Sequence, residues 1–367
     1  MKRLTEFDQL ADPTFSQAVV DWQRAHGRHT LPWQNTRDAY RIWLSEIMLQ
    51  QTQVAAVLGY YARFLERFPT VQALADAPSE DVMAHWSGLG YYTRARNLHA
   101  CAKQVVRDYG GAFPDDPALL AGLPGIGRST AAAIAAFSSG ARAAILDGNV
   151  KRVFARVFGV DQYPGEKRVE DALWRRADAL LPEVGIEAYT QGLMDLGATL
   201  CTRSKPDCAR CPLQARCIAY ATGRTAELPV RKPKKTTPEK RALMLALIDG
   251  GQVLLEQRPE TGIWGGLLSL PEIDGHLALG EARPNEAAVM AAASAFGLVD
   301  EMQALLPLVH VFTHYKLHIV PYKVALAARG AASERHVWWD LAKIGEAPLP
   351  APIKKLLLEL GQPSLFV

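Results

Sequence analysis

Apolar residues recur with helical spacing from residue 15 to about residue 220, in blocks that Gly and Pro divide. The breaks read FPT, GLG, FPDDP, LPGIG and LPEVG, and no segment between them has the pattern of a strand. The pattern changes after RKPKKTTPEK (231–240). Short segments rich in apolar and β-branched residues follow it, bounded by Gly or Pro: ALMLALID, QVLLEQR, LHIVPYKVAL and HVWWDL. The sequence therefore predicts an all-α unit followed by a smaller unit of strands and helices.

Length and charge refine this picture. A chain of 367 residues exceeds a single typical core, so at least two domains are expected. The net charge of +3 does not indicate a class of binding partner, but residues 224–241 carry seven lysines and arginines and only two glutamates. Such a basic strip attracts phosphate or is a solvated linker. The N-terminus lacks a signal-peptide core and no apolar run reaches the length of a membrane span, which predicts a cytoplasmic protein without membrane contact.

Four of the five cysteines lie between residues 201 and 217, with the spacing Cys201-x6-Cys208-x2-Cys211-x5-Cys217. A reducing compartment argues against disulfides, and four soft thiolates in a short loop predict iron–sulfur or zinc ligation. The spacing leaves both metals open. Arg203 and Lys205 add positive charge, which suits a DNA backbone or is ordinary surface charge. The fifth cysteine, Cys101, lies in a helical pattern and is expected in the core.

A second candidate site is LPGIGRSTAAAIAAF (123–137). Gly125 and Gly127 precede an Ala-rich helix that begins near Ser129. Glycines allow a tight turn with exposed N–H groups, and the following helix N-terminus stabilises an anion. This is the pattern of a helix-hairpin-helix that holds a DNA phosphate, although an ordinary turn has the same short pattern.

Glu46 is a candidate acid because its surroundings are apolar. The stretch YRIWLSEIMLQQTQV (40–54) is apolar on nearly every face, which predicts a buried helix. Burial raises the pKa of a carboxyl group and keeps it protonated near neutral pH, as general acid catalysis requires. The alternative is a buried glutamate satisfied by neighbouring backbone groups.

Asp147 is a candidate anion in LDGNVKRVFARVF (146–158), where it stands immediately before a new helix. A carboxylate at a helix N-terminus is expected to stay ionised, although a turn or helix cap also uses Asp-Gly-Asn. A protonated glutamate beside an ionised aspartate could donate a proton to one end of a glycosidic bond and stabilise the cation at the other.

Seven stretches together resemble the MutY family of adenine DNA glycosylases, within the helix-hairpin-helix superfamily. They are LPWQ, WLSEIMLQQTQV, GLGYYTRARNLH, LPGIGRSTA, ILDGNVKRV, MDLGA and the cysteine loop. The resemblance implies an all-α catalytic domain at 1–225, with a six-helix subdomain at 36–140 and an iron–sulfur subdomain from 1–35 and 141–225. A basic linker at 226–240 and an α+β NUDIX-like lesion-recognition domain at 241–367 would follow.

The resemblance implies removal of adenine mispaired with 8-oxoguanine or guanine in double-stranded DNA, by a monomer that carries a [4Fe–4S] cluster on the four clustered cysteines. Glu46 would protonate adenine N7, Asp147 would stabilise the oxocarbenium ion, and Asn149 would assist. Ser129 stands where endonuclease III relatives carry the Schiff-base lysine, which implies hydrolysis by water without strand cleavage. Gln191 would face the adenine edge.

Further residues match the family's DNA contacts. Gln51 and Tyr91 would insert into the base stack around the lesion, and stacking of about 1–3 kcal/mol per base would offset much of the unstacking cost. Phe312-Thr313-His314 resembles the loop that contacts 8-oxoguanine, and Thr52 is another candidate contact. The helix NEAAVMAAASAFGL lacks the clustered glutamates that hold Mg²⁺ in NUDIX hydrolases. Two other functions stay open: an endonuclease III-like pyrimidine glycosylase with lyase activity, and a catalytically silent DNA-damage binder with structural zinc.

Overall fold

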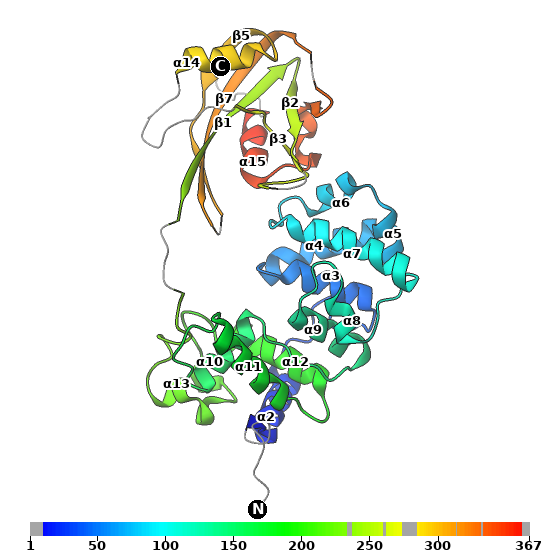
Figure 1. Ribbon diagram of the computed structural model, residues 1–367, viewed down its shortest axis with the longest axis vertical. Helices are drawn as coiled ribbons and strands as arrows, with labels where there is room; N and C mark the ends of the chain where they lie inside the picture. Colours follow the sequence, from blue (N-terminus) through cyan, green and yellow to red (C-terminus); the bar gives the residue numbers. More distant parts are fainter. Residues whose placement is uncertain are drawn as a thin grey trace, which may run out of the picture. The chain divides into compact units, whose positions relative to one another are not determined.

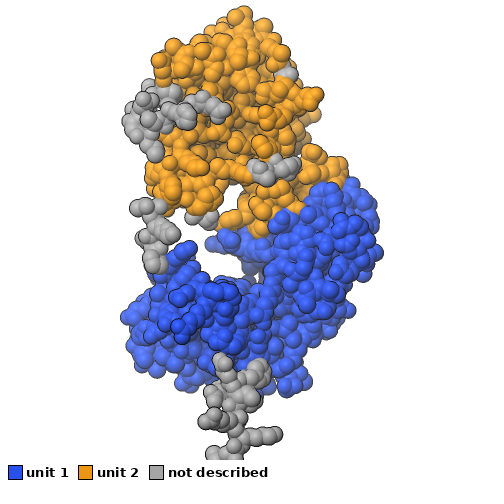
Figure 2. Space-filling view, viewed as in Figure 1, with its two compact units in different colours: residues 1–76, 97–234 blue, residues 77–96, 235–367 orange. Residues whose placement is uncertain are grey.

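A computed structural model of the chain describes residues 10–232, 237–259, 262–273, 285–312, 314–331 and 333–361. The chain divides into two compact units, shown in separate colours in Figure 2. Unit 1 comprises residues 1–76 and 97–234, and unit 2 comprises residues 77–96 and 235–367. The change between them at residue 234 falls within the basic segment at 226–240. The finer domain boundaries given above stay predictions.

The described residues of unit 1 form helices joined by turns and irregular segments, and no strands. Its helices are α2 (Pro13–His26), α3 (Ala39–Leu49), α4 (Val54–Arg67), α5 (Val71–Asp76), most of α7 (Thr93–Tyr109), α8 (Pro117–Ala121), α9 (Arg128–Ser139), α10 (Gly148–Val157), α11 (Lys167–Ala179), α12 (Ile186–Asp195) and α13 (Ile218–Ala221). Three short elements complete it: the π-helix η1 (Leu196–Leu200) and the 3-10 helices η2 (Cys208–Arg210) and η3 (Gln214–Arg216). The all-α prediction is confirmed here.

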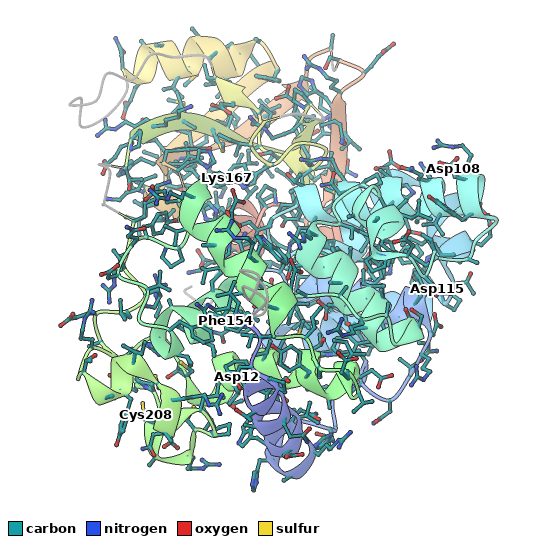
Figure 3. All side chains as sticks on the ribbon, turned by 60° about the horizontal axis from the view of Figure 1, so that its bottom comes forward. Asp12, Asp108, Asp115, Phe154, Lys167 and Cys208 are labelled. Carbon is teal, nitrogen blue, oxygen red and sulfur yellow. The ribbon has the colours of Figure 1, made fainter. Side chains whose placement is uncertain are left out.

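The first helix joins a group of helices much later in the chain. Asp12 caps α2 by accepting hydrogen bonds from the amides of Thr14 (3.0 Å) and Phe15 (3.1 Å). Figure 1 shows α2 beside α12, and Figure 3 labels Asp12 and Phe154 in this group. Phe15 and Phe154 are fully buried, with ring centroids 5.9 Å apart. This core holds the start of α10, and therefore Asp147, in a fixed place.

The helix predicted across residues 40–54 is shorter than expected. α3 ends at Leu49, and α4 begins at Val54. Gln51 has a positive φ of 56°, a left-handed conformation that a continuous α-helix excludes. The polar run Gln50-Gln51-Thr52-Gln53 was the only sequence signal of this turn. Glu46 consequently lies in the last turn of α3, close to the end of the helix.

Unit 2 contains a mixed sheet with helices. Its strands are β1 (Glu239–Asp249), β2 (Gln252–Gln257), β3 (Leu268–Ser269), β4 (Glu272–Ile273), β5 (Gly297–Ala304), β6 (Leu308–Val311), β7 (Lys316–Arg329) and β8 (His336–Asp340). Its helices are α6 (Ser79–Trp86), the first turn of α7, α14 (Glu286–Ser294), the 3-10 helix η4 (Leu341–Glu346) and α15 (Ala351–Leu360). Strands β1, β2, β7 and β8 confirm the four predicted segments, whereas the other four gave no recognisable signal.

The centre of the sheet explains the long apolar run in β1. β1 pairs with β7 in parallel and with β2 in antiparallel orientation. Leu243, Leu245 and Leu247 of β1 pack in one core with Val289 and Ala293 of α14. The alternate residues Ala242, Met244 and Ala246 face the opposite side and are also buried. A strand covered on both faces is apolar throughout and does not alternate.

One predicted helix ends early for a steric reason. The segment NEAAVMAAASAFGL was expected to be helical to its end, but α14 ends at Ser294 and β5 begins at Gly297. Gly297 has φ 155°, and a Cβ there would lie 2.2 Å from the carbonyl oxygen of Ala328. Only glycine allows the backbones of β5 and β7 to approach this closely.

Candidate active site

A pocket of about 570 Å³ opens in unit 1 beside Glu46. It is formed by α2, the segment between α2 and α3, α3 itself, α9 and α12. Most of the lining residues are polar, among them Gln23, Arg28, His29, Gln34, Asn35 and Gln191. A polar molecule that can exchange hydrogen bonds fits such a lining.

Glu46 lies in this pocket with buried neighbours on its own helix. Ile42, Trp43 and Ile47 are at most 3% exposed. Burial raises the pKa of Glu46 from 4.5 to about 8, and the nearby negative charge of Asp147 contributes to the same rise. Glu46 is therefore protonated at neutral pH, as the sequence predicted, and the two carboxyl groups are close enough to interact.

Asp147 is the N-cap of α10, and its side chain accepts a hydrogen bond from the amide of Val150 at 2.9 Å. The sequence predicted that the helix terminus would hold this carboxyl ionised. Burial is the largest influence and raises the pKa of Asp147, so the helix terminus does not lower that pKa below its ordinary value. The amides of Val150 and Asn149 and the cations Arg152 and Lys151 oppose the rise.

The two carboxyl groups nevertheless differ in charge state. Two amides and two cations favour the anion of Asp147, whereas both influences on Glu46, burial and the charge of Asp147, favour its acid form. When the pair of carboxyl groups loses one proton, the anion that is better stabilised forms. That anion is Asp147, so Asp147 ionises first and Glu46 keeps its proton. The arrangement can donate a proton and stabilise a positive charge at the same time.

Ser129 and Asn149 support the segment that carries Asp147. The hydroxyl of Ser129 accepts a hydrogen bond from the amide of Leu146 at 2.9 Å, which joins the start of α9 to this segment. The Asn149 side-chain oxygen accepts one from Arg152 Nη2 at 2.8 Å. A Cβ at Gly197 of η1 would lie 2.4 Å from the Cβ of Asn149, so this glycine allows the π-helix to contact the site.

Two arginines of α10 connect this segment with the cysteine loop. Arg152 donates to the carbonyl of Cys201 through Nε (2.8 Å) and to the carbonyl of Gly197 through Nη2 (2.6 Å). Arg156, 2% exposed, donates to the Cys201 sulfur at 3.3 Å and to the Thr202 carbonyl at 2.7 Å. These arginines carried no distinctive sequence signal beyond their place in a basic helix.

The four clustered cysteines line a single pocket together with apolar residues of α10 and η1. Figure 3 labels Cys208 in this loop. Burial raises the pKa of Cys208, Cys211 and Cys217, to about 11 for Cys211, and charges on neighbouring cysteines add to the rise. Within the described part of the chain, no three Cys, His, Asp or Glu side chains are grouped so that they could hold a metal ion. Cys101 is fully buried elsewhere in unit 1, as predicted.

The predicted helix-hairpin-helix consists of α8, a turn and α9. Gly125 has φ 77°, and a Cβ there would lie 2.8 Å from the Cβ of Asn97, so both conformation and space require glycine. Gly127, the N-cap of α9, has an ordinary φ of −87° and open space around its missing side chain. The N-terminus of α9 is therefore accessible to an anion. Arg203 and Lys205 are exposed beyond the first cysteine.

Two predicted insertion residues occupy left-handed turns. Gln51 is exposed with φ 56°, and the hydroxyl of its neighbour Thr52 donates to the carbonyl of Gln50 at 3.3 Å. In unit 2, Tyr91 has φ 50° and is 47% exposed. The Arg94 guanidinium lies 5.5 Å from the Tyr91 ring centroid and donates to the carbonyl of Gly90 at 3.1 Å. Strained backbones that project exposed side chains are typical of binding sites.

A second large pocket, of about 830 Å³, lies within unit 2. Tyr91, Trp264, Phe312 and His314 line it, and the rings of Trp264 and Phe312 are 5.7 Å apart. His314 is exposed between β6 and β7. Thr313, the remaining predicted contact of this loop, lies outside the described residues. The pocket is aromatic, as a base-binding surface would be.

Two further residues belong to the surroundings of the first pocket, Arg28 in its lining and Asp195 as the partner of Arg28, and neither had a recognisable sequence signal. Asp195 is 1% exposed and accepts hydrogen bonds from the Arg28 amide (2.8 Å), from Arg28 Nε (2.7 Å) and from Gln191 Nε2 (2.8 Å). The MDLGA motif contains Asp195 but indicates no role for it. Arg28 and Asp195 are 167 positions apart, so no local pattern could have paired them.

Family comparisons identify both units. Residues 44–178 match the HhH-GPD superfamily of base excision DNA repair proteins, and residues 243–359 match the NUDIX domain. An adenine DNA glycosylase of Buchnera aphidicola (subsp. Schizaphis graminum) is 35% identical over 347 residues, covering 94% of this chain and 97% of that protein. The human adenine DNA glycosylase is 32% identical over 387 residues, covering 87% of this chain and 68% of that protein.

Solved structures agree on the helical fold. A thermostable thymine-DNA glycosylase is 30% identical with a TM-score of 0.52, covering 57% of this chain and 96% of that one. Endonuclease III in a non-covalent DNA complex is 20% identical with a TM-score of 0.50, covering 60% of this chain and 99% of that one. At this identity the likeness shows the fold alone. Among the described residues, no helix is both long and apolar enough for a membrane span.

Proposed function

The chain belongs to the adenine DNA glycosylases of base excision repair, and from this premise we propose that it hydrolyses the glycosidic bond of adenine opposite 8-oxoguanine or guanine. The observation that carries the proposal is the pair of interacting carboxyl groups, Glu46 protonated and Asp147 favoured as the anion. An N-glycosidic bond needs both states at once, because the base leaves with an electron pair and the sugar becomes cationic.

The reaction begins with the extruded adenine beside Glu46. Glu46 donates its proton to N7 of the base, the bond between N9 and C1′ breaks, and its electron pair stays on the adenine. The anion of Asp147 stabilises the oxocarbenium ion that forms. Water then attacks C1′ and its proton passes to a carboxylate, which leaves an abasic sugar in the DNA.

Nearby residues favour hydrolysis over strand cleavage. Ser129 offers a hydroxyl where a lyase would need an amine, and that hydroxyl is held by the Leu146 amide. Asn149, fixed by Arg152, lies beside Asp147 in the chain and would assist at the sugar. Gln191 lines the pocket with Glu46 and would contact the edge of the base.

DNA would be held by backbone groups and inserted side chains. We assign the phosphate contact to the accessible N-terminus of α9 at Gly125 and Gly127, with Arg203 and Lys205 adding charge. Gln51 and Tyr91 project from left-handed turns and would fill the space left by the extruded base. Thr52, Thr313 and His314 are assigned to 8-oxoguanine, on the basis of the family motif and the aromatic pocket around His314.

We assign a [4Fe–4S] cluster to the cysteine loop, as the family resemblance implies. All four cysteines line one pocket, and four thiolates are the usual ligand set of such a cluster. Cys201, Cys208, Cys211 and Cys217 would hold it, and the cluster would supply a structural cross-link for the loop.

We further propose that the protein works as a monomer on double-stranded DNA. A repair enzyme must reach the chromosome, so the corresponding location is cytoplasmic and nucleoid-associated. In support, the pocket beside Glu46 and the proposed anion site both consist of residues of one chain.

The test is adenine release from a duplex that contains one adenine opposite 8-oxoguanine. Glu46→Gln keeps the shape of the side chain but removes its acidic proton, and we expect the single-turnover rate to fall by about 10²–10⁴-fold. Glu66→Gln, at an exposed position of α4, is the control and should match the wild type. Equal rates for wild type and Glu46→Gln would refute the role of Glu46. Covalent trapping by borohydride would indicate a lyase instead.

A further inference from the structure

We propose that Asp195 is a positioning residue that fixes the amide of Gln191 in one orientation and thereby selects a base with a hydrogen-bond donor at that edge. The inference rests on the proposed placement of the extruded base beside Glu46. Asp195 itself does not line the pocket, whereas Gln191 does. Asp195 would therefore act only through its neighbour.

The orientation follows from the partners of Asp195. One carboxylate oxygen accepts from Gln191 Nε2 at 2.8 Å and from Arg28 Nε at 2.7 Å, and the other accepts from the Arg28 amide at 2.8 Å. Arg28 also forms an ion pair with Asp195 at 2.7 Å. A carboxylate has only acceptors to offer. A rotated Gln191 would place its carbonyl oxygen against that carboxylate, so the rotated state is disfavoured.

The fixed orientation leaves Gln191 Oε1, an acceptor, for the pocket. Gln191 and Asp195 are four positions apart on α12, and Asp195 is 1% exposed, so water does not compete for the contact. Adenine carries an amino donor at position 6, whereas hypoxanthine carries a carbonyl there. A carbonyl opposite Oε1 leaves two acceptors facing each other in a desolvated site, which discriminates strongly against hypoxanthine.

The experiment compares single-turnover excision of adenine and hypoxanthine, each opposite the same partner base. We expect the wild type to prefer adenine, and Gln191→Met to lower the ratio of the two rates by about tenfold or more. Asp195→Ala should lower the ratio as well, because it removes the acceptor that holds Gln191 Nε2 and leaves both rotations of the Gln191 amide accessible.

A double-mutant cycle separates positioning from general damage. If Asp195 acts through Gln191, Asp195→Ala has no further effect on the ratio once Gln191→Met is present. Equal losses in both backgrounds, or an unchanged ratio in active Asp195→Ala enzyme, would overturn the proposal. Asp171→Ala, in an exposed ion pair with Lys167 on α11, is the matched control and should keep the wild-type ratio.

Gln191→Glu keeps the proposal testable if Asp195→Ala does not fold. The new carboxyl group offers an acceptor to the pocket whether it shares a proton with Asp195 or is ionised, so the preference for adenine over hypoxanthine should persist. Loss of that preference in active Gln191→Glu enzyme would contradict selection by an acceptor at this position. Failure of the proposed function would look different, since wild type and Glu46→Gln would then release adenine equally.

Discussion

Glu46 and Asp147 are both largely buried carboxyl groups of one site, but they lie at opposite ends of their helices. Glu46 is in the last turn of α3 among buried apolar side chains. Asp147 precedes the first turn of α10, where amides and cations point toward it. Burial raises the pKa of both, so burial alone does not set their charge states.

The difference lies in what each carboxyl group receives from its surroundings. Asp147 accepts the Val150 amide and is attracted by Arg152 and Lys151, whereas Glu46 experiences the repulsion of Asp147. A helix N-terminus therefore makes one of two buried acids the anion, and that anion keeps the other protonated. The pair works as a unit, and changing either member should alter the other.

Neutralising Asp147 is expected to have the largest effect. Asp147→Asn keeps an acceptor for the Val150 amide but removes the negative charge, so adenine release should fall by about 10²–10⁴-fold while the fold is retained. Asp147→Ala should lose similar activity and also about 1 kcal/mol of stability with the helix cap. Single-turnover rates and chemical denaturation of both variants measure the two effects. An active Asp147→Asn enzyme would show that its charge is dispensable.

Loss of a cysteine should affect the surroundings of Asp147 through the loop that Arg152 contacts. Cys208→Ser is expected to lower the iron and sulfide content and the unfolding temperature by several degrees, because the loop loses its cross-link. Cys101→Ser, at a buried position outside the loop, should keep full iron content. Metal analysis measures the iron and sulfide content of both variants, and thermal melting measures their unfolding temperatures. Zinc in place of iron would contradict the assignment of the cluster.

The two hairpin glycines allow a smaller and sharper test. Gly125→Ala meets both a left-handed φ and the Asn97 side chain, so it should cost about 1–3 kcal/mol of stability. Gly127→Ala is free of both problems and should leave stability nearly unchanged, but its methyl group enters the space assigned to a phosphate. Gly125→Ala should therefore mainly lower the stability measured by denaturation, whereas Gly127→Ala should mainly lower the affinity measured by DNA-binding titration. Equal effects on both measurements would remove the phosphate assignment.

Local patterns were sufficient for much of the fold. Helical periodicity identified the all-α unit, and a continuous apolar run identified β1, which is central in the sheet and buried on both faces. The short strands β3 and β4 have two residues each and leave no periodicity to detect. The break after α3 was missed because no Gly or Pro marks it, and the left-handed Gln51 is apparent only in the structure.

The site was predictable where its residues stand in distinctive short motifs. Glu46 and Asp147 could be identified from an apolar helix and a helix start. Their mutual influence could not, because about a hundred residues separate them. The same holds for Arg28 with Asp195 and for Arg156 with Cys201, since a contact between distant segments is set by packing and not by local pattern.

The most direct measurement is a titration of the Glu46 carboxyl by ¹³C NMR, in wild type and in Asp147→Asn. The account predicts a pKa of about 8 in the wild type, and a lower pKa once the negative charge of Asp147 is removed. It also predicts an adenine-release rate that declines above this pH, since only the protonated acid donates, and that declines at low pH as Asp147 becomes protonated. A pKa near 4.5 in the wild type, or one unchanged by Asp147→Asn, would contradict the account.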